Sequence, residues 1–423
     1  MVLANLIRET KRPLRIAIID PSPHAPLGVA YSTPCPEHLL NVPADRMGAF
    51  ADNPKGFFEW LQSGNSPIGP NDFAPRMLYG EYLRGIFEEA LRQAEKKNIS
   101  VTRISAEVRD VTPGTPLQLK TSTGETLAAA SIVLCTGNYF SAFAPPGRRH
   151  ITDVWHFDAA ALAQEAPPGL PVVLIGTGLT AVDVLCSLEQ SGWQGNIIAV
   201  SRHGTFPRPH LETKAPEWPQ DAWNATRASL HLSQLFRAIR QQVKVAAAQQ
   251  VPWQKVFDSL RPHTSRLWQS LPVADQRRVF ARYMTLWNIH RHRMPAGAER
   301  MINAMKQEGR LTLQSGRVVK VEEQDACVIV RYRSGTQETT LRAALAFDCT
   351  GPRTQQLPPL VQRLVEHGLV ARAANGVGLA LDAQMKASPS IYAIGSMAVG
   401  MLLESTAVPT LREQAQAVAA ALA

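Results

Sequence analysis

One stretch of the chain, residues 171–204, constrains its fold more than any other. The apolar run Val172–Ile175 predicts a buried parallel strand. A glycine turn, Gly176-Thr-Gly178, and an apolar pattern of helical period follow it. A second apolar run, Ile197–Val200, predicts the next strand. Strand, glycine turn, helix and strand in this order form a βαβ unit of the kind that binds dinucleotides.

Three positions of this unit have separate physical roles. Gly176 permits the tight turn, Gly178 lets backbone amides approach a pyrophosphate at the helix N-terminus, and Ala181 allows the helix to pack closely on the strand. An ordinary glycine turn of an α/β domain is the alternative. The second strand ends at Ser201-Arg202-His203 and has no acid there. Because Arg accommodates a 2′-phosphate where Asp or Glu would bind ribose hydroxyls, Arg202 favours NADPH over NADH. The alternative for Arg202 is a solvated loop charge.

A second candidate nucleotide site lies near the N-terminus. The apolar strand Leu14–Ile19 ends at Asp20, the position at which an acid binds ribose hydroxyls. Upstream lie only Met1–Pro13, whose first seven residues look like the end of a helix, and neither a preceding strand nor a glycine turn is seen. Two interpretations are open. Either the chain as given starts about 20 residues late, by the usual spacing from glycine turn to acid, or this βαβ unit has lost its first strand.

The chain also contains an internal repeat. Residues 99–137 resemble residues 310–351: each segment has short alternating strands, a Ser/Thr-Gly turn and an apolar strand that ends in Cys-Thr-Gly, at Gly137 and Gly351. We expect two β-meanders that bracket the nucleotide unit. Pieces of this kind are typical of proteins that hold two dinucleotides. Two unrelated meanders are the alternative.

The C-terminal residues predict one more strand and a final helix. The strand Ile391–Ile394 ends at Gly395, and the helix is expected over Thr410–Leu422, with Ser405 or Thr406 as its N-cap. Because a helix N-terminus carries partial positive charge, it suits the electron-rich edge of a reduced flavin. A capped final helix without such a role is the alternative.

Charge and tryptophan content distinguish the middle of the chain. Residues 201–310 contain 18 Lys and Arg against 7 Asp and Glu, although the whole chain carries only +9. A local excess favours an anionic partner. Because no helix-turn-helix, zinc-finger or RNA-recognition signature is present, a phosphorylated cofactor is expected rather than nucleic acid. Five of the eight tryptophans lie in 215–310, where helical spacing predicts an insertion that covers the site. In His290-Arg-His-Arg293 the arginines disfavour a metal, which leaves an anion contact or a salt-bridged helix face.

Several classes of protein are excluded. The five cysteines form no C-x-x-C pair, which excludes a zinc ribbon and a dithiol redox centre. No window holds 18 uninterrupted apolar residues, so no membrane-spanning segment is expected. The N-terminus shows no secretory leader, and the cytoplasm is the expected location. The sequence shows no acid–base triad.

Further motifs, taken with those above, resemble a known family. They are Gly28-Val-Ala-Tyr31-Ser-Thr33, His38-Leu-Leu-Asn41-Val-Pro43, Phe73-Ala-Pro-Arg76-Met-Leu-Tyr79, Trp287–Arg293 and Glu404–Pro409. Together they resemble the bacterial FAD/NAD(P)-binding oxidoreductase family that includes a FAD-dependent urate hydroxylase. That family is distantly related to the flavin-containing and the ornithine/lysine N-monooxygenases. Its pattern opens with a strand and G-x-G-x-x-G for the FAD pyrophosphate, and this sequence lacks that opening.

The resemblance implies a flavin enzyme. FAD would bind an outer domain and NAD(P)H an inserted one, hydride would pass to the flavin, and the reduced flavin would activate O₂ to hydroxylate a small molecule. For Tyr31 and Asn41 a structural turn role is an equal alternative, and for Arg76 the alternative is a contact across the domain interface. The residues that would then contact FAD are Asp20, Gly28, Tyr31, Asn41, Arg76, Val108 (through backbone groups at the adenine), Gly137, Gly395 and Thr406.

We therefore expect an α/β fold of three layers with two dinucleotide-binding, Rossmann-like domains, β-meanders and a helical insertion. The FAD domain would comprise 1–165 and 311–423, and the NAD(P) domain 166–310 with its helical insertion at about 215–300. The expected activity is that of a FAD-dependent NAD(P)H oxidoreductase, a monooxygenase of a small molecule, with no nucleic-acid or membrane partner. The competing hypothesis is a cofactor-poor remnant that binds NADP or a partner.

Overall fold

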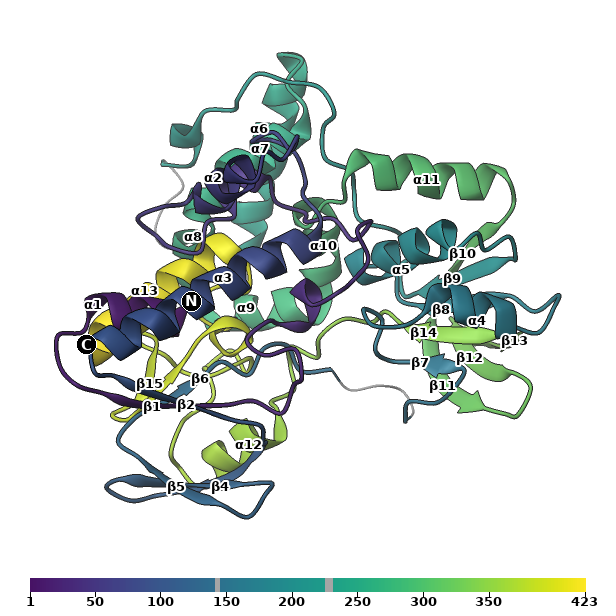
Figure 1. Cartoon of the computed structure of the whole chain (residues 1–423). Helices are drawn as coiled ribbons and strands as arrows, with labels where there is room; N and C mark the ends of the chain where they lie inside the picture. Colours follow the sequence, from purple (N-terminus) through teal and green to yellow (C-terminus); the bar gives the residue numbers. More distant parts are fainter. Residues whose placement is uncertain (141–144, 225–230) are drawn as a thin grey trace.

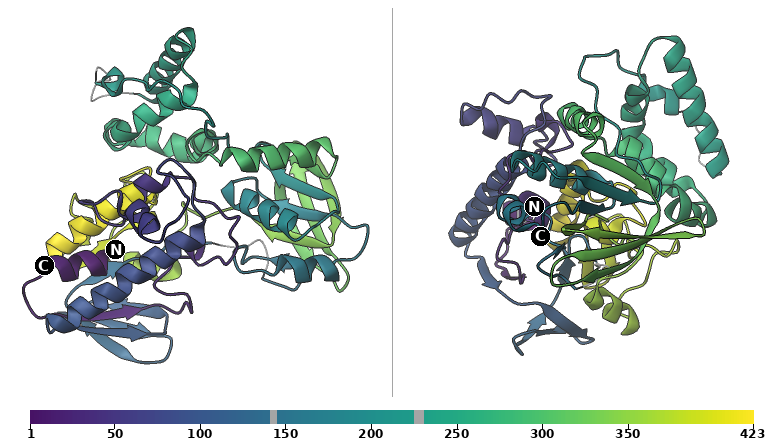
Figure 2. Two further views of the ribbon diagram at one scale, coloured as in Figure 1. Left: turned by 45° about the horizontal axis from the view of Figure 1, so that its top comes forward. Right: turned by 90° about the vertical axis from the view of Figure 1, so that its right-hand side faces the viewer.

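The computed structural model describes the chain except residues 141–144 and 225–230. Three bodies are visible in the left view of Figure 2. One contains both chain termini, a second contains a five-stranded sheet, and a group of helices lies next to both. We refer to them as the first unit, the second unit and the helical cover.

The second unit contains the predicted βαβ motif. Strand β8 (Val172–Ile175) leads through the glycine turn into α5 (Leu179–Gln190) and then into β9 (Ile197–Ser201). The strands lie in the order β10-β9-β8-β14-β7, and every pair is parallel. The remaining strands are β10 (Leu311–Ser315), β14 (Leu345–Asp348) and β7 (His150–Ile151).

Alternating side chains of β8 build two hydrophobic cores. Val172 and Leu174 pack against α5 and α11 (Ala296–Gln307), whereas Val173 and Ile175 pack against a meander on the opposite face. This meander consists of β11 (Arg317–Glu323), β12 (Val328–Ser334) and β13 (Gln337–Ala343). Helices, sheet and meander are the three layers that the sequence predicts, and a strand buried on both faces explains why β8 is apolar throughout.

The first unit repeats this plan. Its parallel strands β1 (Arg15–Ile19) and β2 (Ser100–Ile104) pair with one another, and β6 (Ile132–Leu134) pairs with β16 (Ile391–Ala393). A three-stranded meander follows β2, as another follows β10. The remaining elements of this unit are α1 (Val2–Glu9), α2 (Gly56–Ser63), α3 (Arg76–Lys96), β3 (Val108–Thr112), β4 (Leu117–Thr121), β5 (Thr126–Ala129), α12 (Pro359–Glu366), β15 (Lys386–Ser388) and α13 (Val408–Leu422).

One part of the second unit has no counterpart among the described residues of the first. In the second unit β8 lies between β9 and β14. The equivalent strands of the first unit, β1 and β6, belong to two separate sheets, and no strand precedes α1 in the described part of the chain. The helix predicted at the N-terminus is therefore present, as α1, and corresponds to α5.

The sheets correct the predicted domain boundaries. The sequence assigns residues 311–348 to the FAD domain, but β10 pairs with β9 and β14 pairs with β8 in the second unit. Residues 150–165, which were also assigned to the FAD domain, supply β7 and the helix α4 (Ala159–Glu165) to the second unit. The reason is the repeat itself. Each meander belongs to the same unit as the strand that directly precedes it in the chain, which is β2 in the first unit and β10 in the second.

The helical cover occupies the predicted insertion. Trp268 of α8 donates from its indole Nε1 to the carbonyl of Gly400 at 2.9 Å, and this bond anchors the cover on the first unit. Val377 and Val399 of the first unit complete its core. Its elements are α6 (Leu232–Ala248), α7 (Trp253–Leu260), α8 (Thr264–Ser270), α9 (Val273–Arg278), a π-helical turn (Val279–Tyr283) and α10 (Met284–Arg291).

The final helix differs from the prediction at its start. Helix α13 begins at Val408, its N-cap is Ala407, and no side chain caps it. Ser405 and Thr406 precede it in a turn in which the amide of Ala407 donates to the carbonyl of Glu404 at 3.1 Å. Pro409 lies in the first turn as predicted, where its missing amide costs nothing. The sequence indicates a polar N-cap because Ser and Thr favour that position, but here the preceding turn holds both residues.

Candidate functional site

The glycine turn of the second unit is built for close backbone approach. Gly176 has a φ of +107°, and a Cβ placed there would lie 2.6 Å from the carbonyl oxygen of Cys349 at the end of β14. Gly178 differs, because it is the N-cap of α5 in an ordinary extended conformation with open space beside it. No side chain caps α5. The free amides and the open space fit a pyrophosphate at this helix N-terminus.

Hydrogen bonds fix the turn to the end of β9. Thr177 Oγ1 donates to the carbonyl of Thr205 at 2.6 Å and lies 2.9 Å from the hydroxyl of Ser201. Arg202 is exposed immediately after this strand, and its Nη2 donates to the hydroxyl of Thr285 on α10 at 3.4 Å. Since no carboxylate pairs with it among the described residues, its guanidinium is available at the position predicted for a 2′-phosphate.

The strand ends of the first unit form a second candidate nucleotide site. Asp20 follows β1, and one of its carboxylate oxygens accepts from the amide of Ser22 at 2.8 Å. Gly137 and Gly395 follow β6 and β16 with φ of +64° and +69°. The hydroxyl of Ser396 donates to the carbonyl of Gly137, and Gln414 Oε1 accepts from the amide of Gly395 at 2.9 Å. The two glycines are therefore held side by side, as parallel strand ends at a ligand edge require.

Two helix N-termini face these strand ends. Figure 1 shows α1 and α13 side by side and running in the same direction, away from the centre of the molecule. The α-amino group of Met1 lies near Cys135 at the end of β6, and burial lowers the pKa of this amino group. Val108, the predicted adenine contact, opens β3 beside Asp110 in the adjoining meander. The strand ends and helix N-termini together fit a dinucleotide. Among the described residues, the first unit has no counterpart of β8 and its glycine turn.

The segment from Gly28 to Asn41 crosses from the first unit to the second. Gly28 opens a short 3₁₀ turn (Val29–Tyr31), and the ring of Tyr31 meets that of Tyr79 edge-on at 4.8 Å. Burial raises the pKa of Tyr31. The carbonyl of Asn41 accepts from Nε2 of His210 at 3.1 Å, which links the segment to the chain that leads into the helical cover.

Arg76 makes a contact across the domain interface, which the sequence analysis gives as the alternative to a contact with FAD. Its Nη2 lies 3.1 Å from Asp183 Oδ2 on α5, and its Nε donates to the carbonyl of Leu39 at 3.1 Å. A second contact with α5 comes from His38, whose Nε2 lies 2.8 Å from the hydroxyl of Ser187. Burial raises the pKa of Asp183, and the neighbouring Arg76 opposes that shift. Arg76 thus joins the two units, and its predicted contact with FAD stays a prediction.

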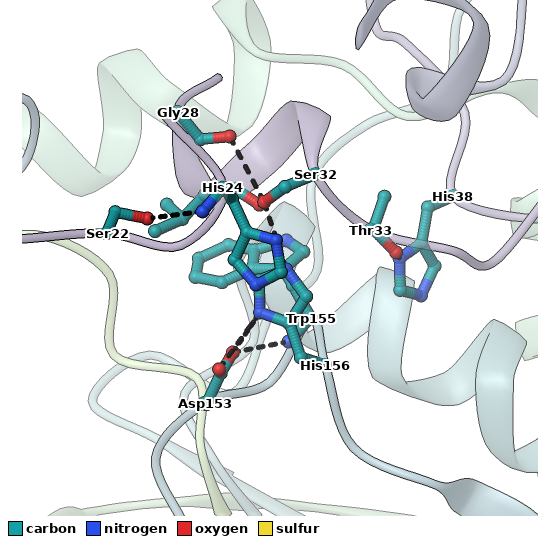
Figure 3. Close-up of polar contacts among 10 residues, drawn as sticks. Ser22, His24, Gly28, Ser32, Thr33, His38, Asp153, Trp155 and His156 are labelled. Carbon is teal, nitrogen blue, oxygen red and sulfur yellow. Dashed lines mark hydrogen bonds and ion pairs between the residues drawn. The ribbon is translucent and has the colours of Figure 1, made fainter. Parts of the chain in front are cut away.

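The sequence shows no acid–base triad, but the fold brings together three polar side chains that no local sequence pattern links. Figure 3 shows Ser32, His156 and Asp153 in a hydrogen-bonded series. The Ser32 hydroxyl lies 2.9 Å from His156 Nε2, and His156 Nδ1 lies 2.9 Å from Asp153 Oδ2. His24 stacks on His156 with ring centroids 4.3 Å apart. Asp153 and His156 are three residues apart, so their contact could have been predicted from the sequence. Ser32 is remote in the chain, and no sequence pattern links it to them.

This series connects the two units through polar groups that can pass a proton. A neutral imidazole that donates from Nδ1 to Asp153 leaves Nε2 free to accept from Ser32. Asp153 is largely exposed, with a side-chain exposure of 62%, whereas His156 is at 18%. The arrangement therefore suits transfer of a proton between solvent and the segment beside the strand ends.

The two arginines of the His290–Arg293 cluster form ion pairs. Arg291 and Glu404, both buried, form a bidentate pair at 2.5 and 2.7 Å, and Arg293 pairs with Asp258. Among the described residues no group of three His, Cys, Asp or Glu could hold a metal ion. Burial, and secondarily Arg291, lowers the pKa of His292 to about 4. The salt-bridged alternative therefore holds for both arginines.

The fold is that of a two-unit protein of the Rossmann type, and each unit has a candidate nucleotide site. Residues 1–139 match a family model described as FAD-NAD(P)-binding. The nitrosuccinic acid synthase of Aspergillus oryzae is 28% identical over 198 residues, which are 41% of this chain and 30% of that protein. This chain thus spans less than a third of the length of that curated relative. The predicted fold class, with two Rossmann-like units, is confirmed, and the family match over residues 1–139 agrees with it.

Solved structures share the fold over the whole chain. An ornithine N-hydroxylase of Kutzneria sp. 744, described with reduced FAD, NADP⁺ and L-ornithine, has a TM-score of 0.62 at 15% identity and covers 100% of this chain and 95% of its own. The ornithine hydroxylase of Pseudomonas aeruginosa has a TM-score of 0.64 at 14% identity, with the same coverage. The L-lysine 6-monooxygenase of Pseudomonas syringae has 0.57 at 13%, covering 100% of this chain and 96% of its own. No helix among the described residues is long and apolar enough to cross a bilayer.

Proposed function

We propose that this protein is a FAD-dependent NAD(P)H monooxygenase of a small molecule. The observation that carries the proposal is the duplicated plan, in which two units each offer strand ends and helix N-termini, and segment 28–41 joins them directly. Two adjacent dinucleotide sites in one polypeptide are what electron transfer between two cofactors requires. Relatives of the same fold are named for N-hydroxylation of ornithine and lysine, which supports a small-molecule substrate.

We assign roles to residues of this chain accordingly. When bound, NADPH would supply hydride, and FAD would accept it and activate O₂. The Gly176–Gly178 turn would bind the NADPH pyrophosphate, and Arg202 would bind its 2′-phosphate. Asp20 would bind the FAD ribose, Val108 the adenine through its backbone, and Gly137, Gly395 and Thr406 would lie along the isoalloxazine side. The Ser32–His156–Asp153 series would move protons between solvent and the reacting edge.

The division into domains that we propose follows the sheets. A FAD domain would comprise residues 1–140 and 352–423, and an NADP domain would comprise 146–214 and 296–351, with the helical cover between its two parts. We place the protein in the cytoplasm, which the five free cysteines support, because disulfides are rare there.

A second candidate function has one observation in its favour. Among the described residues, no strand pairs with both β1 and β6, whereas β8 pairs with both β9 and β14. The first unit therefore offers fewer groups to a cofactor than the second. A cofactor-poor protein that binds NADP alone would fit this asymmetry.

One experiment separates the two functions. The purified chain is titrated with FAD, and flavin binding is followed by the visible bands at about 370 and 450 nm. Oxygen uptake is then measured with NADPH, without and with candidate small-molecule substrates. The monooxygenase proposal predicts stoichiometric FAD binding and oxygen uptake that depends on NADPH. NADPH binding without any FAD binding would support the second function and reject the first.

A further inference from the structure

The helical cover encloses a cavity of about 800 Å³ that no part of the proposed reaction uses. Its walls come from α6, α7, α8 and α10, and Leu403 of the first unit also lines it. This volume falls in the range of sites that bind small organic ligands, which is roughly 300–1,000 Å³. The cavity therefore has room for a substantial molecule.

The interior of this cavity is apolar and rich in aromatic rings. Phe236 of α6 meets Tyr283 at 5.0 Å between ring centroids, and Phe257 of α7 lies 6.2 Å from Trp287 of α10. None of these four rings is fully buried by the protein itself. The indole Nε1 of Trp287 is buried but has no hydrogen-bond partner among the described residues. Apolar surface left partly open inside a concave site favours an apolar ligand.

Cations line the same cavity on the side of α6. Ile239 and Val243 lie on the apolar face of this helix, and Arg240 and Lys244 follow them by one residue at the edge of that face. Arg240 and Lys244 are exposed, and neither has an ion pair among the described residues. Arg208, which also lines the cavity, is likewise exposed.

Three acidic residues of the cover are already paired with other cations. Asp258 pairs with Arg293, Asp275 with Arg278, and Glu217 with Lys255. The edge of the cavity therefore carries net positive charge, in agreement with the excess of Lys and Arg in residues 201–310. A positively charged edge above an apolar interior is complementary to a molecule with an apolar body and an anionic head.

We propose that this cavity binds an amphipathic carboxylate, with its apolar body among the aromatic rings and its carboxylate against Arg240 and Lys244. None of the lining residues is among those that we assign to the two nucleotide sites, so we expect binding there without either cofactor. Leu403 adjoins Glu404, whose pair with Arg291 ties the cover to the first unit. A ligand in the cavity would thus lie next to the contact that positions the cover.

Dodecanoate, kept below the concentration at which it forms micelles, is the probe for this site. Its binding to the full chain is measured by calorimetry and by the fluorescence of the cavity tryptophans Trp253 and Trp287. Dodecanol supplies the same body without charge, dodecyltrimethylammonium the opposite charge, and acetate the head alone. We expect dodecanoate to bind about tenfold more tightly than dodecanol, with no measurable binding of acetate.

Two variants test the geometry. Charge reversal in Arg240→Glu/Lys244→Glu should weaken dodecanoate binding about tenfold and remove its preference over dodecanol. Arg282→Glu, at an exposed position of the helical cover outside the cavity lining, is the matched control and should leave the affinity unchanged. Val243→Trp should fill the interior and weaken dodecanoate and dodecanol together. Circular dichroism and thermal melting verify that each variant is folded.

Three results would overturn the proposal. The first is dodecyltrimethylammonium binding as tightly as dodecanoate, and the second is an equal effect of Arg282→Glu and of the double reversal. The third is that dodecanoate fails to bind, in which case sedimentation tests whether a second copy of the chain covers this face. None of these measurements involves turnover, so failure here is distinguishable from failure of the proposed monooxygenase function.

Discussion

Gly176 and Gly178, two residues apart in one turn, show how differently the same residue type can serve a structure. Gly176 is required by the protein itself, because its φ is positive and β14 passes close by. Gly178 has an ordinary φ and open space around it. The space beside Gly178 is therefore available to a ligand rather than to the fold.

This difference predicts the effect of Gly178→Ala. The protein should keep its stability, since the added methyl meets no atom within 4 Å. The KM for NADPH should rise about tenfold or more, because the methyl obstructs the pyrophosphate. Steady-state kinetics and thermal melting measure the two effects. Gly297→Ala, another open position, is the control, and a Gly178→Ala variant with unaltered KM would contradict the assignment of this turn.

Arg202 determines which nicotinamide cofactor is preferred, in our account. Arg202→Ala should raise the KM for NADPH about tenfold, the effect of losing one or two charge-assisted hydrogen bonds, and leave the KM for NADH nearly unchanged. The exposed Arg282→Ala serves as the control. Equal changes in the KM for NADPH and the KM for NADH would show that Arg202 is a solvated loop charge.

Two histidines make stability depend on pH. Burial lowers the pKa of both His210 and His292 to about 4, from 6.5 in the unfolded chain. Below pH 6.5 the unfolded chain therefore binds protons that the folded chain does not, and stability falls as pH decreases from 6.5 toward 4. Between pH 7 and pH 5, each histidine should lower the free energy of unfolding by up to about 2 kcal/mol.

Urea unfolding at pH 7 and pH 5 measures this dependence. His292→Gln should reduce the loss of unfolding free energy between the two pH values, whereas the exposed His203→Gln should leave it as it is in the parent chain. An unchanged pH dependence in His292→Gln would contradict the burial of a neutral imidazole at that position.

At the scale of elements, helix α3 contains a matched pair of glycines. A Cβ at Gly80 would overlap the carbonyl oxygen of Tyr31, because the 3₁₀ turn at Val29–Tyr31 packs directly on this helix. Gly85 lies on the same helix, is exposed and has nothing within 4 Å of a Cβ. The two positions share helix propensity and differ in packing.

Opposite effects on stability are therefore expected. Gly85→Ala should stabilise the protein by about 0.5–1 kcal/mol, and Gly80→Ala should destabilise it by about 1–3 kcal/mol through overpacking. Chemical denaturation measures both. Stabilisation by Gly80→Ala would show that segment 28–31 does not pack on α3 as described.

The elements that the sequence predicted best are those with local signals. Strand β8 has its predicted bounds, and β9 extends one residue beyond its own, because an apolar run with a glycine turn is a short-range pattern. The start of α13 was missed by two residues, since the preceding turn competes for Ser405 and Thr406. The sheet to which residues 311–348 belong could not be predicted, because pairing with β9 depends on contacts remote in sequence.

At the scale of the whole molecule, the contacts between the units were the least predictable. The pairs Arg76–Asp183 and Ser32–His156 join residues that are far apart along the chain, and no local pattern marks either pair. Sequence motifs indicated two nucleotide units and a repeated meander, but only the fold shows that segment 28–41 lies against α5, between the two units.

The central claim is that occupants of the two units exchange electrons. Anaerobic mixing of the FAD-loaded chain with NADPH, followed at about 450 nm, measures this directly. The account predicts that NADPH bleaches the flavin band with saturable kinetics, and that Gly178→Ala raises the NADPH concentration for half-maximal rate. A chain that binds both cofactors yet keeps its flavin oxidised in the presence of NADPH would contradict it.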